Sequence, residues 1–412
     1  MDTVATGKPI FVARQPIFDA ARDVQAYELL FRSSLENRCR STCGDSSTLD
    51  VISSTFVEIG IDELTGGRRA FINFTRNLLL EDVPSLLSPE LMTVEILEDI
   101  EPDEPVLRAC RKLKDAGYTL ALDDFVLRHT NSPLLELADI VKVDFLQTTP
   151  DQREKIVADL VRRKITPLAE KVETEEEFNQ AAACGFTHFQ GYFFSRPAIH
   201  KGRTLSASKL AHLQMMEQLS RPEISIDELE RVIKQDVPLS YKLLRFIASA
   251  WFGLKHEITS IRHALAWLGN REVRKWYYLV CLRDIGSDKP SELLVRSIAR
   301  AKMAEGIAMH MGQVKQAPGL FLLGMFSLID VLLDMPMDEV VQRLPLDEPL
   351  KNALLGQPSP LRQVLDTVIS YERGDWDSFA THATALKLDD DLVPDIFRKS
   401  LKWADQACQT VS

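Results

Sequence analysis

Short hydrophobic stretches recur through the first 200 residues at intervals of roughly twenty to thirty residues, and each ends on or runs into a charged or amide side chain. The seven stretches are AYELLFR, AFINF, MTVEILE, TLALDDF, DIVKVD, TPLAEKVE and THFQGYFF. Burying an unpaired charge is costly, so a carboxylate does not help a buried strand. The repeated pattern therefore indicates one shared polar site, built from Glu28, Asn73, Glu95, Asp123, Asp124, Lys142, Asp144, Glu170 and Gln190.

Amphipathic segments with helical spacing lie between these stretches. Residues 104–117 and 174–185 are two examples, and Gly117 and Gly185 are typical of the residue that stops a helix. Alternation of short strands and helices predicts a parallel α/β domain. Seven or eight such units predict a (β/α)8, TIM-like barrel over residues 1–200 rather than an open sheet. In such barrels the functional groups lie at the C-terminal ends of the strands.

The pattern changes to helical spacing after about residue 204. The segments ISIDELERVIKQD and PLSYKLLRFIASAWFG repeat apolar residues at helical intervals, and Ser225 followed by Glu228 is a capping-box pattern. Breaks such as Gly269 and Pro336 separate the segments. We therefore expect a linker or connecting helix at 201–215 and an all-helical domain over 216–412.

Composition and charge narrow the class of protein. The chain of 412 residues has a formal net charge of −11, which argues against direct nucleic-acid binding. No run of about 18 apolar residues predicts membrane insertion, and the first residues lack a secretory signal pattern, so we expect a cytoplasmic protein. The six cysteines form no CxxC pair, which favours reduced thiols over a zinc site.

The polar residues of the first half are mostly oxygen donors. Carboxylate and amide oxygens favour Mg²⁺ or Mn²⁺ over zinc. The adjacent Asp123 and Asp124 suit a site with two ions, because one can bridge both ions while the other binds one. Two divalent ions about 3.5–4 Å apart serve in-line displacement at a phosphoester. Lys142 would place a cation near a phosphate or the attacking water, with Asp144 tuning it.

Eight motifs within residues 10–200 together resemble the EAL domain, the fold of bacterial cyclic di-GMP phosphodiesterases. They are RQPIF (14–18), YELLFR (27–32), FINF (71–74), VEILE (94–98), LALDDF (120–125), VKVD (141–144), AEKVET (169–174) and FQGYFFSRP (189–197). The resemblance implies a two-metal site for Mg²⁺ or Mn²⁺. Its ligands would be Glu28, Asn73 and Glu95 for the first ion, Asp123 as the bridge, and Asp124 and Glu170 for the second.

The same resemblance implies roles in catalysis and substrate binding. Glu170 and Lys142 would lie beside the hydrolytic water, and Gln190 would complete the catalytic pocket. Arg32 would contact a substrate phosphate, with Gln15 and Asp144 also on the substrate side. Glu173 would steady the loop that follows the double aspartate.

Two single residues and one loop depart from the EAL pattern. Leu29 replaces the alanine of the signature tripeptide, and Lys171 replaces a glycine after Glu170. The glycine-rich loop that follows the double aspartate in active members is here Val126-Leu127-Arg128-His129. Glycine permits backbone conformations that other residues avoid, so a different loop path is expected. The ligands are present, but the residues that support them are altered, and support at the level of an ångström decides the rate.

The second half resembles the HDOD domain, an all-helical relative of the HD phosphohydrolases. The matching stretches are QDVPL (235–239), Leu243–Ser249 and IRHAL (261–265) up to Leu268-Gly269. HD catalysis requires a His-Asp dipeptide, and the chain contains none; after FLLGMF (321–326) it continues Ser327-Leu328. We therefore expect no metal here, with His263 and His310 as structural residues.

The two halves together resemble the EAL–HDOD signalling proteins, the YuxH-like group. Our leading hypothesis is a regulatory protein of cyclic di-GMP signalling whose degenerate EAL domain binds nucleotide or protein partners with weak or no hydrolysis. Its HDOD domain would contact an unidentified signalling protein. Most of its aromatic residues would be core and a minority would form the exposed partner surface; these residues are Trp251, Phe252, Trp267, Trp276, Tyr277 and Tyr278. The alternative is an active Mg²⁺- or Mn²⁺-dependent phosphodiesterase that forms linear pGpG. A protein scaffold that no longer binds nucleotide is a third possibility.

Overall fold

The computed structural model describes residues 11–32, 61–123, 132–195, 209, 212–214, 216, 225–235, 237–248, 260–344, 346–389 and 392–411. The chain divides into two compact units. The first unit contains Met1–Arg196 together with Asp366–Arg398, and the second contains Pro197–Leu365 with Lys399–Ser412. Asp124, the loop at 126–129, Cys39, Cys43 and Trp251 lie outside the described residues, so the expectations for them stay predictions.

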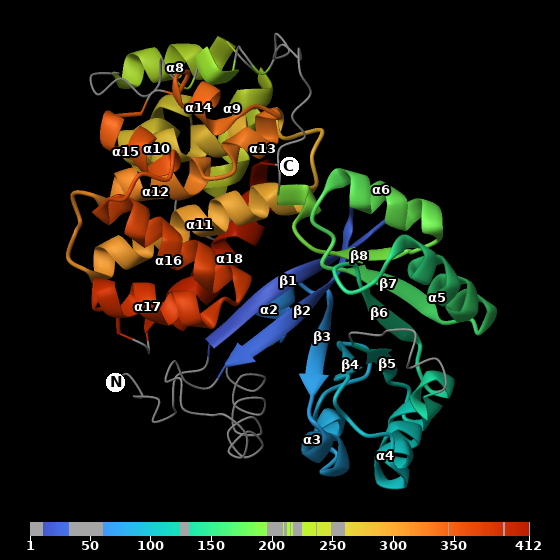
Figure 1. Cartoon of the computed structure of the whole chain (residues 1–412). Helices are drawn as coiled ribbons and strands as arrows, with labels where there is room; N and C mark the ends of the chain where they lie inside the picture. Colours follow the sequence, from blue (N-terminus) through green and yellow to red (C-terminus); the bar gives the residue numbers. More distant parts are fainter. Residues whose placement is uncertain are drawn as a thin grey trace. The chain divides into compact units, whose positions relative to one another are not determined.

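The first unit is built on a closed barrel of eight strands in the order of the sequence, which confirms the expected TIM-like fold (Figure 1). From β2 to β8, each strand is parallel to the next. The strands are β1 (Phe11–Asp19), β2 (Val24–Arg32), β3 (Arg69–Phe74), β4 (Met92–Ile96), β5 (Thr119–Leu122), β6 (Ile140–Asp144), β7 (Thr166–Glu170) and β8 (His188–Gln190).

Strand β1 runs antiparallel to both of its neighbours, β2 and β8, and so departs from an all-parallel barrel. Only residues 20–23 separate β1 from β2. A parallel connection needs a crossover of a dozen or more residues, whereas a short turn permits only a hairpin. Arg22 supplies the left-handed backbone of this turn with φ of 67°.

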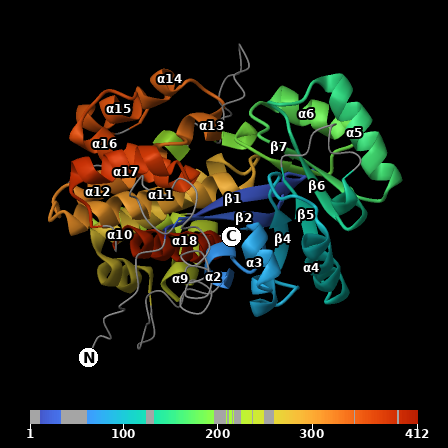
Figure 2. The ribbon, with the colours of Figure 1, turned by 60° about the horizontal axis from the view of Figure 1, so that its bottom comes forward.

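Helices cover the outside of the barrel strands (Figures 1 and 2). Helix α4 begins after the N-cap Asp103, and α6 begins with a capping box of Thr174 and Glu177, so both predicted helices are confirmed. Gly185 ends α6 at φ of 105°, as its sequence position predicts. The elements are α2 (Ile61–Thr65), α3 (Arg76–Leu80), η1 (Val83–Leu86), α4 (Glu104–Asp115), η3 (Pro133–Glu136), α5 (Pro150–Arg162), α6 (Glu175–Cys184) and η4 (Phe193–Ser195).

The barrel interior contains an apolar layer directly beneath the polar residues. Side chains two positions apart on a strand lie on the same face. From β2 to β7, each apolar residue of the layer therefore lies two positions before the polar residue above it. On the reversed strand β1, the apolar residue lies two positions after the polar one. The layer consists of Ile17, Ala26, Phe71, Ala121, Ile140 and Leu168, below Gln15, Glu28, Asn73, Asp123, Lys142 and Glu170.

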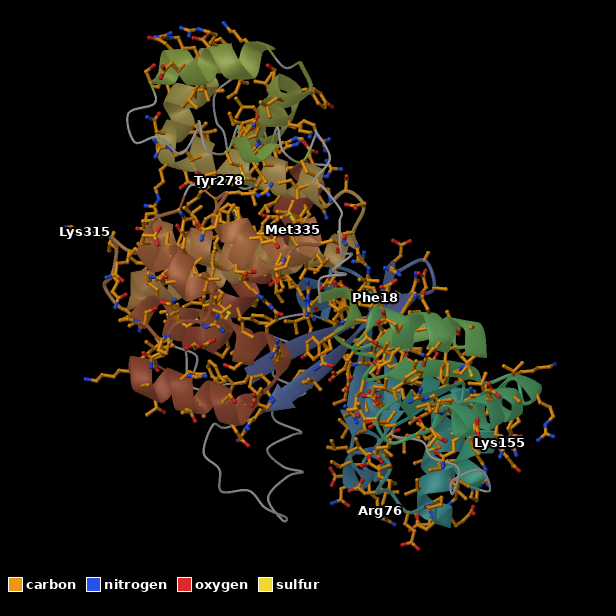
Figure 3. The ribbon with its side chains drawn as sticks, turned by 45° about the horizontal axis from the view of Figure 1, so that its top comes forward. Phe18, Arg76, Lys155, Tyr278, Lys315 and Met335 are labelled. Atoms are coloured by element: carbon orange, nitrogen blue, oxygen red, sulfur yellow. The ribbon has the colours of Figure 1, made fainter. Side chains whose placement is uncertain are left out.

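The second unit is helical throughout its described residues, as expected. The capping box of Ser225 and Glu228 forms at the start of α8, and Gly269 kinks α10 at φ of 74°. Tyr278 is buried within this unit, whereas Lys155 of the barrel unit is exposed (Figure 3). The chain forms α8 (Ile226–Gln235), α9 (Val237–Ala248), α10 (Ile261–Ile285), α11 (Ser291–His310), α12 (Ala317–Phe326), α13 (Ile329–Leu333), α14 (Met337–Val341), α15 (Glu348–Leu354), α16 (Pro360–Arg373), α17 (Trp376–Leu386) and α18 (Leu392–Val411).

Part of the C-terminal region belongs to the barrel unit. The described contacts place Asp366–Arg398, which includes the end of α16, all of α17 and the start of α18, with the strands. Phe11 of β1 lies 6.4, 6.1 and 5.9 Å from the rings of Tyr371, Trp376 and Phe379, measured between centroids. The sequence predicts a single domain over 216–412. It does not predict that Asp366–Arg398 belongs with the barrel strands.

Candidate functional site

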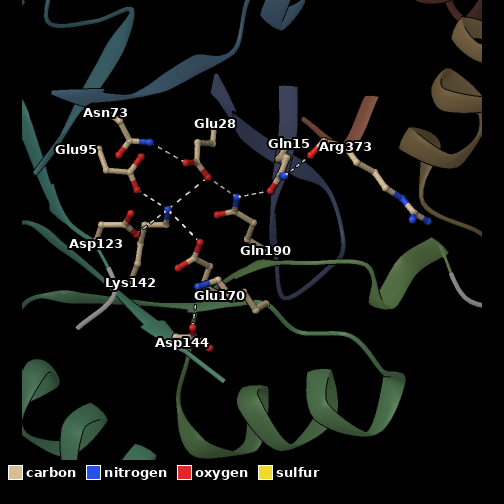
Figure 4. A network of polar contacts seen from close by, with 11 residues as sticks. Gln15, Glu28, Asn73, Glu95, Asp123, Lys142, Asp144, Glu170, Gln190 and Arg373 are labelled. Carbon is tan, nitrogen blue, oxygen red and sulfur yellow. Dashed lines mark hydrogen bonds and ion pairs between the residues drawn. The ribbon is translucent and has the colours of Figure 1, made fainter. Parts of the chain in front are cut away.

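Seven of the predicted site residues meet at one end of the barrel (Figure 4). Strand pairing sets them side by side, since Asn73 pairs with Glu95 across β3 and β4. Hydrogen bonds and ion pairs then join the whole group across the barrel, although its members come from six strands and the residue after β5. The seven are Glu28, Asn73, Glu95, Asp123, Lys142, Glu170 and Gln190.

The ammonium group of Lys142 lies at the centre of four carboxylates and is completely buried. Its Nζ atom is 3.4 Å from Glu28 Oε2, 3.0 Å from Asp123 Oδ1 and 3.5 Å from Glu170 Oε1. It also forms an ion pair with Glu95. One positive charge thus faces four acidic groups, a surplus of three carboxylates (4 − 1 = 3).

Glu28 is the centre of a second set of contacts made by amide side chains. Asn73 Nδ2 donates to Glu28 Oε1 at 3.0 Å, and Gln190 Nε2 donates to Glu28 Oε2 at 2.5 Å. Gln190 Nε2 also donates to Gln15 Oε1 at 3.1 Å. These donors hold the carboxylate of Glu28 in one orientation (Figure 4).

Burial and the neighbouring charges shift the pKa values of the three glutamates in different directions. Burial would raise the pKa of Glu28, but Lys142 and the two amide donors outweigh it and lower that pKa. Burial raises the pKa of Glu95 well above its usual range, and the charges of Glu28 and Asp123 raise it further. Burial, with the charges of Asp123 and Glu28, raises the pKa of Glu170 to about 7.

The pKa of Lys142 is raised, whereas the pKa of an ordinary buried lysine is lowered. Burial alone would lower this pKa, but the adjacent carboxylates raise it well above its usual range. Lys142 is therefore a fixed cation at neutral pH.

Several oxygens of this group are buried and accept no hydrogen bond from the described residues. They are Asn73 Oδ1, Glu95 Oε2, Glu170 Oε2 and Gln190 Oε1. A buried acceptor without a donor is costly. Hard oxygen donors with excess negative charge suit divalent cations such as Mg²⁺ and Mn²⁺. The donor set therefore fits the two-metal prediction.

As they stand, no three carboxylate, histidine or cysteine groups in the described part of the chain are arranged to enclose a metal. Lys142 lies between the carboxylates, and Asp124 is outside the described residues. Metal binding here would therefore require Lys142 and the carboxylates around it to rearrange.

Asp144 lies at the end of β6, two positions after Lys142. Its Oδ1 accepts hydrogen bonds from the backbone N–H groups of Leu146 at 2.6 Å and Gln147 at 3.2 Å. Its Oδ2 lies 2.7 Å from Nζ of Lys171. The carboxylate of Asp144 is thus held by the loop after β6 and by Lys171, and its expected contact with substrate stays a prediction.

The remaining predicted residues lie at the margin of the group. Arg32 Nη1 is 3.3 Å from Asp377 Oδ1, and Gln15 Nε2 donates to the carbonyl oxygen of Arg373 at 3.3 Å. The backbone N–H of Glu173 donates to Glu177 Oε2 at 2.7 Å, and the loop that Glu173 was expected to steady lies outside the described residues. The predicted roles of these residues stay predictions.

Comparisons with known proteins identify the family. The EAL domain model matches residues 8–197, and the HDOD domain model matches residues 208–342. The chain is 38% identical over 402 residues to YuxH of Bacillus subtilis (strain 168), covering 96% of this chain and 98% of that protein. The chain belongs to the EAL–HDOD family.

Two further EAL proteins are similar to this chain. The cyclic di-GMP phosphodiesterase CdgJ of Vibrio cholerae serotype O1 is 37% identical over 399 residues, which cover 96% of this chain and 92% of CdgJ. A solved structure of Klebsiella pneumoniae BlrP1 in a manganese and cy-diGMP complex is 25% identical, with a TM-score of 0.39, and covers 48% of this chain and 58% of that chain.

Two of the departures from the EAL pattern lie in described residues, Leu29 and Lys171. Leu29 is buried on β2 beside Glu28. Lys171, in place of a glycine, adopts a left-handed backbone with φ of 56°, so it keeps the conformation that a glycine would favour. Neither side chain occurs among the contacts of Lys142 given above.

In the HDOD part of the chain, the residues around the missing His-Asp dipeptide form ordinary helix contacts. Ser327 Oγ donates to the carbonyl of Gly324 at 2.7 Å and accepts from Arg300 Nη1 at 3.1 Å. His263 and His310 are both exposed. Trp276 is buried, whereas Trp267 exposes 44% of its surface, so the expected split between core and surface aromatics is observed for these two.

Two residues that contact the site were not found from the sequence. Arg373 and Asp377 flank the turn between α16 and α17, more than 340 positions from the residues they contact. Their segment shows only helical spacing, which carries no information on a distant strand. No pattern in the sequence could have indicated these contacts.

Proposed function

We propose that this protein is a divalent-metal-dependent phosphodiesterase that hydrolyses cyclic di-GMP to linear pGpG. The main support is the buried group around Lys142, in which four carboxylates surround one ammonium group and two of them, Glu95 and Glu170, carry a buried oxygen that accepts no hydrogen bond among the described residues. The similarity to CdgJ over nearly the whole chain supports the same reaction. Among the described residues, no helix is long and apolar enough to span a membrane.

The residues that would hold two metal ions are Glu28, Asn73, Glu95, Asp123, Asp124 and Glu170. When bound, Mg²⁺ or Mn²⁺ ions supply Lewis-acid stabilisation of the negative charge that grows on the phosphate during in-line attack by water. Their positive charge would also favour the ionised forms of Glu95 and Glu170, whose pKa values are raised in the metal-free site.

Glu170 is the best candidate for accepting the proton of the attacking water. Burial raises the pKa of Glu170 to about 7 in the metal-free site, and a bound cation would lower it, so the assignment rests on the position of Glu170 in the group, 3.5 Å from Nζ of Lys142. Lys142 would stay protonated and stabilise the developing negative charge. Asn73 and Gln190 orient Glu28, which keeps the group in place during the reaction.

A turnover assay tests the proposal directly. Purified protein with Mn²⁺ or Mg²⁺ is incubated with cyclic di-GMP, and pGpG is followed by chromatography. We expect turnover, and a loss of roughly 10²- to 10⁴-fold in the Glu170→Gln variant. Glu175→Gln is the matched control, because Glu175 pairs with Arg22 at the start of α6 and does not occur among the contacts of the polar group. Absence of turnover in the wild type under these conditions would contradict the proposal.

Nucleotide binding without hydrolysis is the second candidate function. It agrees with the leading hypothesis from the sequence. Two observations support it: Lys142 lies among the carboxylates, and the described acidic groups do not enclose a metal as they stand. In that case calorimetry would detect cyclic di-GMP binding while the assay detects no pGpG. The exposed Trp267 would then mark a surface of the helical region for an unidentified signalling partner.

A further inference from the structure

The turn between α16 and α17 belongs to the barrel unit although neither family model covers it. The EAL model ends at residue 197 and the HDOD model at residue 342. The hydroxyl of Tyr371 accepts a hydrogen bond from the backbone N–H of Val12 on β1 at 3.4 Å. Phe379 and Tyr371 are fully buried against Phe11. These contacts fix the turn beside the first two strands.

Asp377, in the first turn of α17, contacts the residue that we expect to bind a substrate phosphate. Its Oδ1 lies 3.3 Å from Nη1 of Arg32. The side chain of Arg32 exposes 23% of its surface and that of Asp377 exposes 72%, so solvent and solutes reach this pair. Carboxylates and phosphates compete for the same donors of a guanidinium group.

The same turn also contacts the polar group through Gln15. The carbonyl oxygen of Arg373 accepts from Gln15 Nε2, Gln15 Oε1 accepts from Gln190 Nε2, and Gln190 Nε2 donates to Glu28 (Figure 4). A continuous chain of hydrogen bonds therefore runs from the turn to a predicted metal ligand. The turn thus touches the site at two points on adjacent strands.

We propose that the α16–α17 turn forms one wall of the nucleotide site and that Asp377 is a positioning residue for Arg32. Asp377 holds the guanidinium group in the absence of nucleotide and is replaced by a phosphate when cyclic di-GMP binds. The carboxylate therefore weakens nucleotide binding, because it must give up Arg32 and then repels the phosphate. The inference rests on the proposed function, since it assigns the phosphate contact to Arg32.

Removal of the negative charge at position 377 tests the inference. In the Asp377→Asn variant with Mn²⁺ present, we expect KM to fall about two- to fivefold and kcat to stay unchanged. A change of this size corresponds to the free energy of one exposed ion pair. Calorimetry with cyclic di-GMP in EDTA should show the same decrease in Kd. The difference in Kd between the variant and the wild type should shrink in 0.5 M salt, because the screening length there is roughly half of that at physiological salt.

Glu63→Gln is the matched control. Glu63 Oε2 lies 3.4 Å from Nη1 of Arg398, so this variant weakens an ion pair between the same C-terminal segment and α2, away from Arg32. We expect Glu63→Gln to leave KM and Kd unchanged. In an Arg32→Ala background, Asp377→Asn should have no further effect on Kd.

Two results would overturn the inference. One is an unchanged Kd in Asp377→Asn when the wild type binds cyclic di-GMP; the other is a tighter Kd that persists in the Arg32→Ala background. A wild type that neither binds nor hydrolyses cyclic di-GMP is a different result, because it overturns the proposed function and this inference with it. Thermal unfolding of each variant verifies that the barrel is folded.

Discussion

Lys171 combines two opposing effects on stability at a single residue. Its φ of 56° lies in the left-handed region, which costs a non-glycine residue about 1–2 kcal/mol. Its ammonium group lies 2.7 Å from the buried carboxylate of Asp144, which also accepts two backbone hydrogen bonds. The side chain of Lys171 is 39% exposed, so solvent reduces the value of the ion pair.

We predict that Lys171→Met and Lys171→Gly differ in stability at neutral pH. Lys171→Met keeps the backbone strain and loses the ion pair, so its free energy of unfolding should fall by about 0.5–1 kcal/mol. Lys171→Gly loses the ion pair but relieves the strain, so it should stay within about 0.5 kcal/mol of the wild type or exceed it. Urea unfolding measures both. Equal destabilisation of the two variants would contradict this account.

The same pair predicts a dependence on pH. Burial would raise the pKa of Asp144, but Lys171 and the backbone donors outweigh it and lower that pKa below its ordinary range. The stabilisation is therefore complete above about pH 4 and is lost as the pH falls through the lowered pKa. We expect the difference between wild type and Lys171→Met to be constant from pH 5 to 7 and to shrink below pH 4.

At the residue scale, the sequence pattern located most of the polar group. Each of Glu28, Asn73, Glu95 and Glu170 follows or interrupts a strand-like stretch, and parallel strands bring such positions together. The pattern could not assign partners within the group. Asp144, for example, contacts Lys171 and the backbone of the loop after β6, and neither contact follows from its position at a strand end.

At the element scale, β1 and α17 depend on one another although more than 350 residues separate them. Phe379 of α17 is fully buried, and its ring centroid lies 5.0 Å from that of Tyr371 and 5.9 Å from that of Phe11. Close tilted and edge-on contacts of this kind are favourable among buried aromatic rings. The cluster therefore couples the stability of the first strand to the C-terminal helices.

We predict that Phe379→Ala destabilises the barrel unit by about 3–5 kcal/mol, because it leaves a cavity at the aromatic cluster. Hydrogen exchange should show faster exchange in β1 and β2 as well as in α17. Val161→Ala is the control, since Val161 is 57% exposed on α5, and it should stay within about 0.5 kcal/mol. Faster exchange confined to α17 would show that the helix is not part of the barrel core.

Element type was predictable wherever local signals were strong. Asp103 and Thr174 begin α4 and α6, and Gly185 ends α6, as capping rules lead one to expect. The reversed direction of β1 was not predicted. It follows from a four-residue turn that permits only a hairpin, and recognising it requires the pairing partners of β1 as well as its own sequence.

At the scale of the whole molecule, the chain forms two compact units, and the proposed metal site lies within only one of them. A ligand that binds the folded state stabilises the unit that contains its site. The surplus of carboxylates around Lys142 makes the barrel unit the one that should respond to divalent ions.

We predict that calorimetry resolves two unfolding transitions and that Mn²⁺ raises only one of them. At a concentration about 100 times Kd the gain is about 2.7 kcal/mol, which corresponds to roughly 5–10 °C for a unit of this size. EDTA should reverse the shift, and Glu95→Gln together with Asn73→Ala should reduce it. An equal shift of both transitions, or none, would argue against a metal site in the barrel.

The sequence by itself determined the barrel, the helical second half, the family and the polar residues at the strand ends. These follow from periodicity, caps and motifs, which act over a few residues. Only the tertiary structure decided that Asp366–Arg398 packs on the barrel and that Asp377 and Arg373 contact Arg32 and Gln15. Helical spacing shows which face of a helix is apolar, but the surface that covers that face is chosen by the packing of the whole chain.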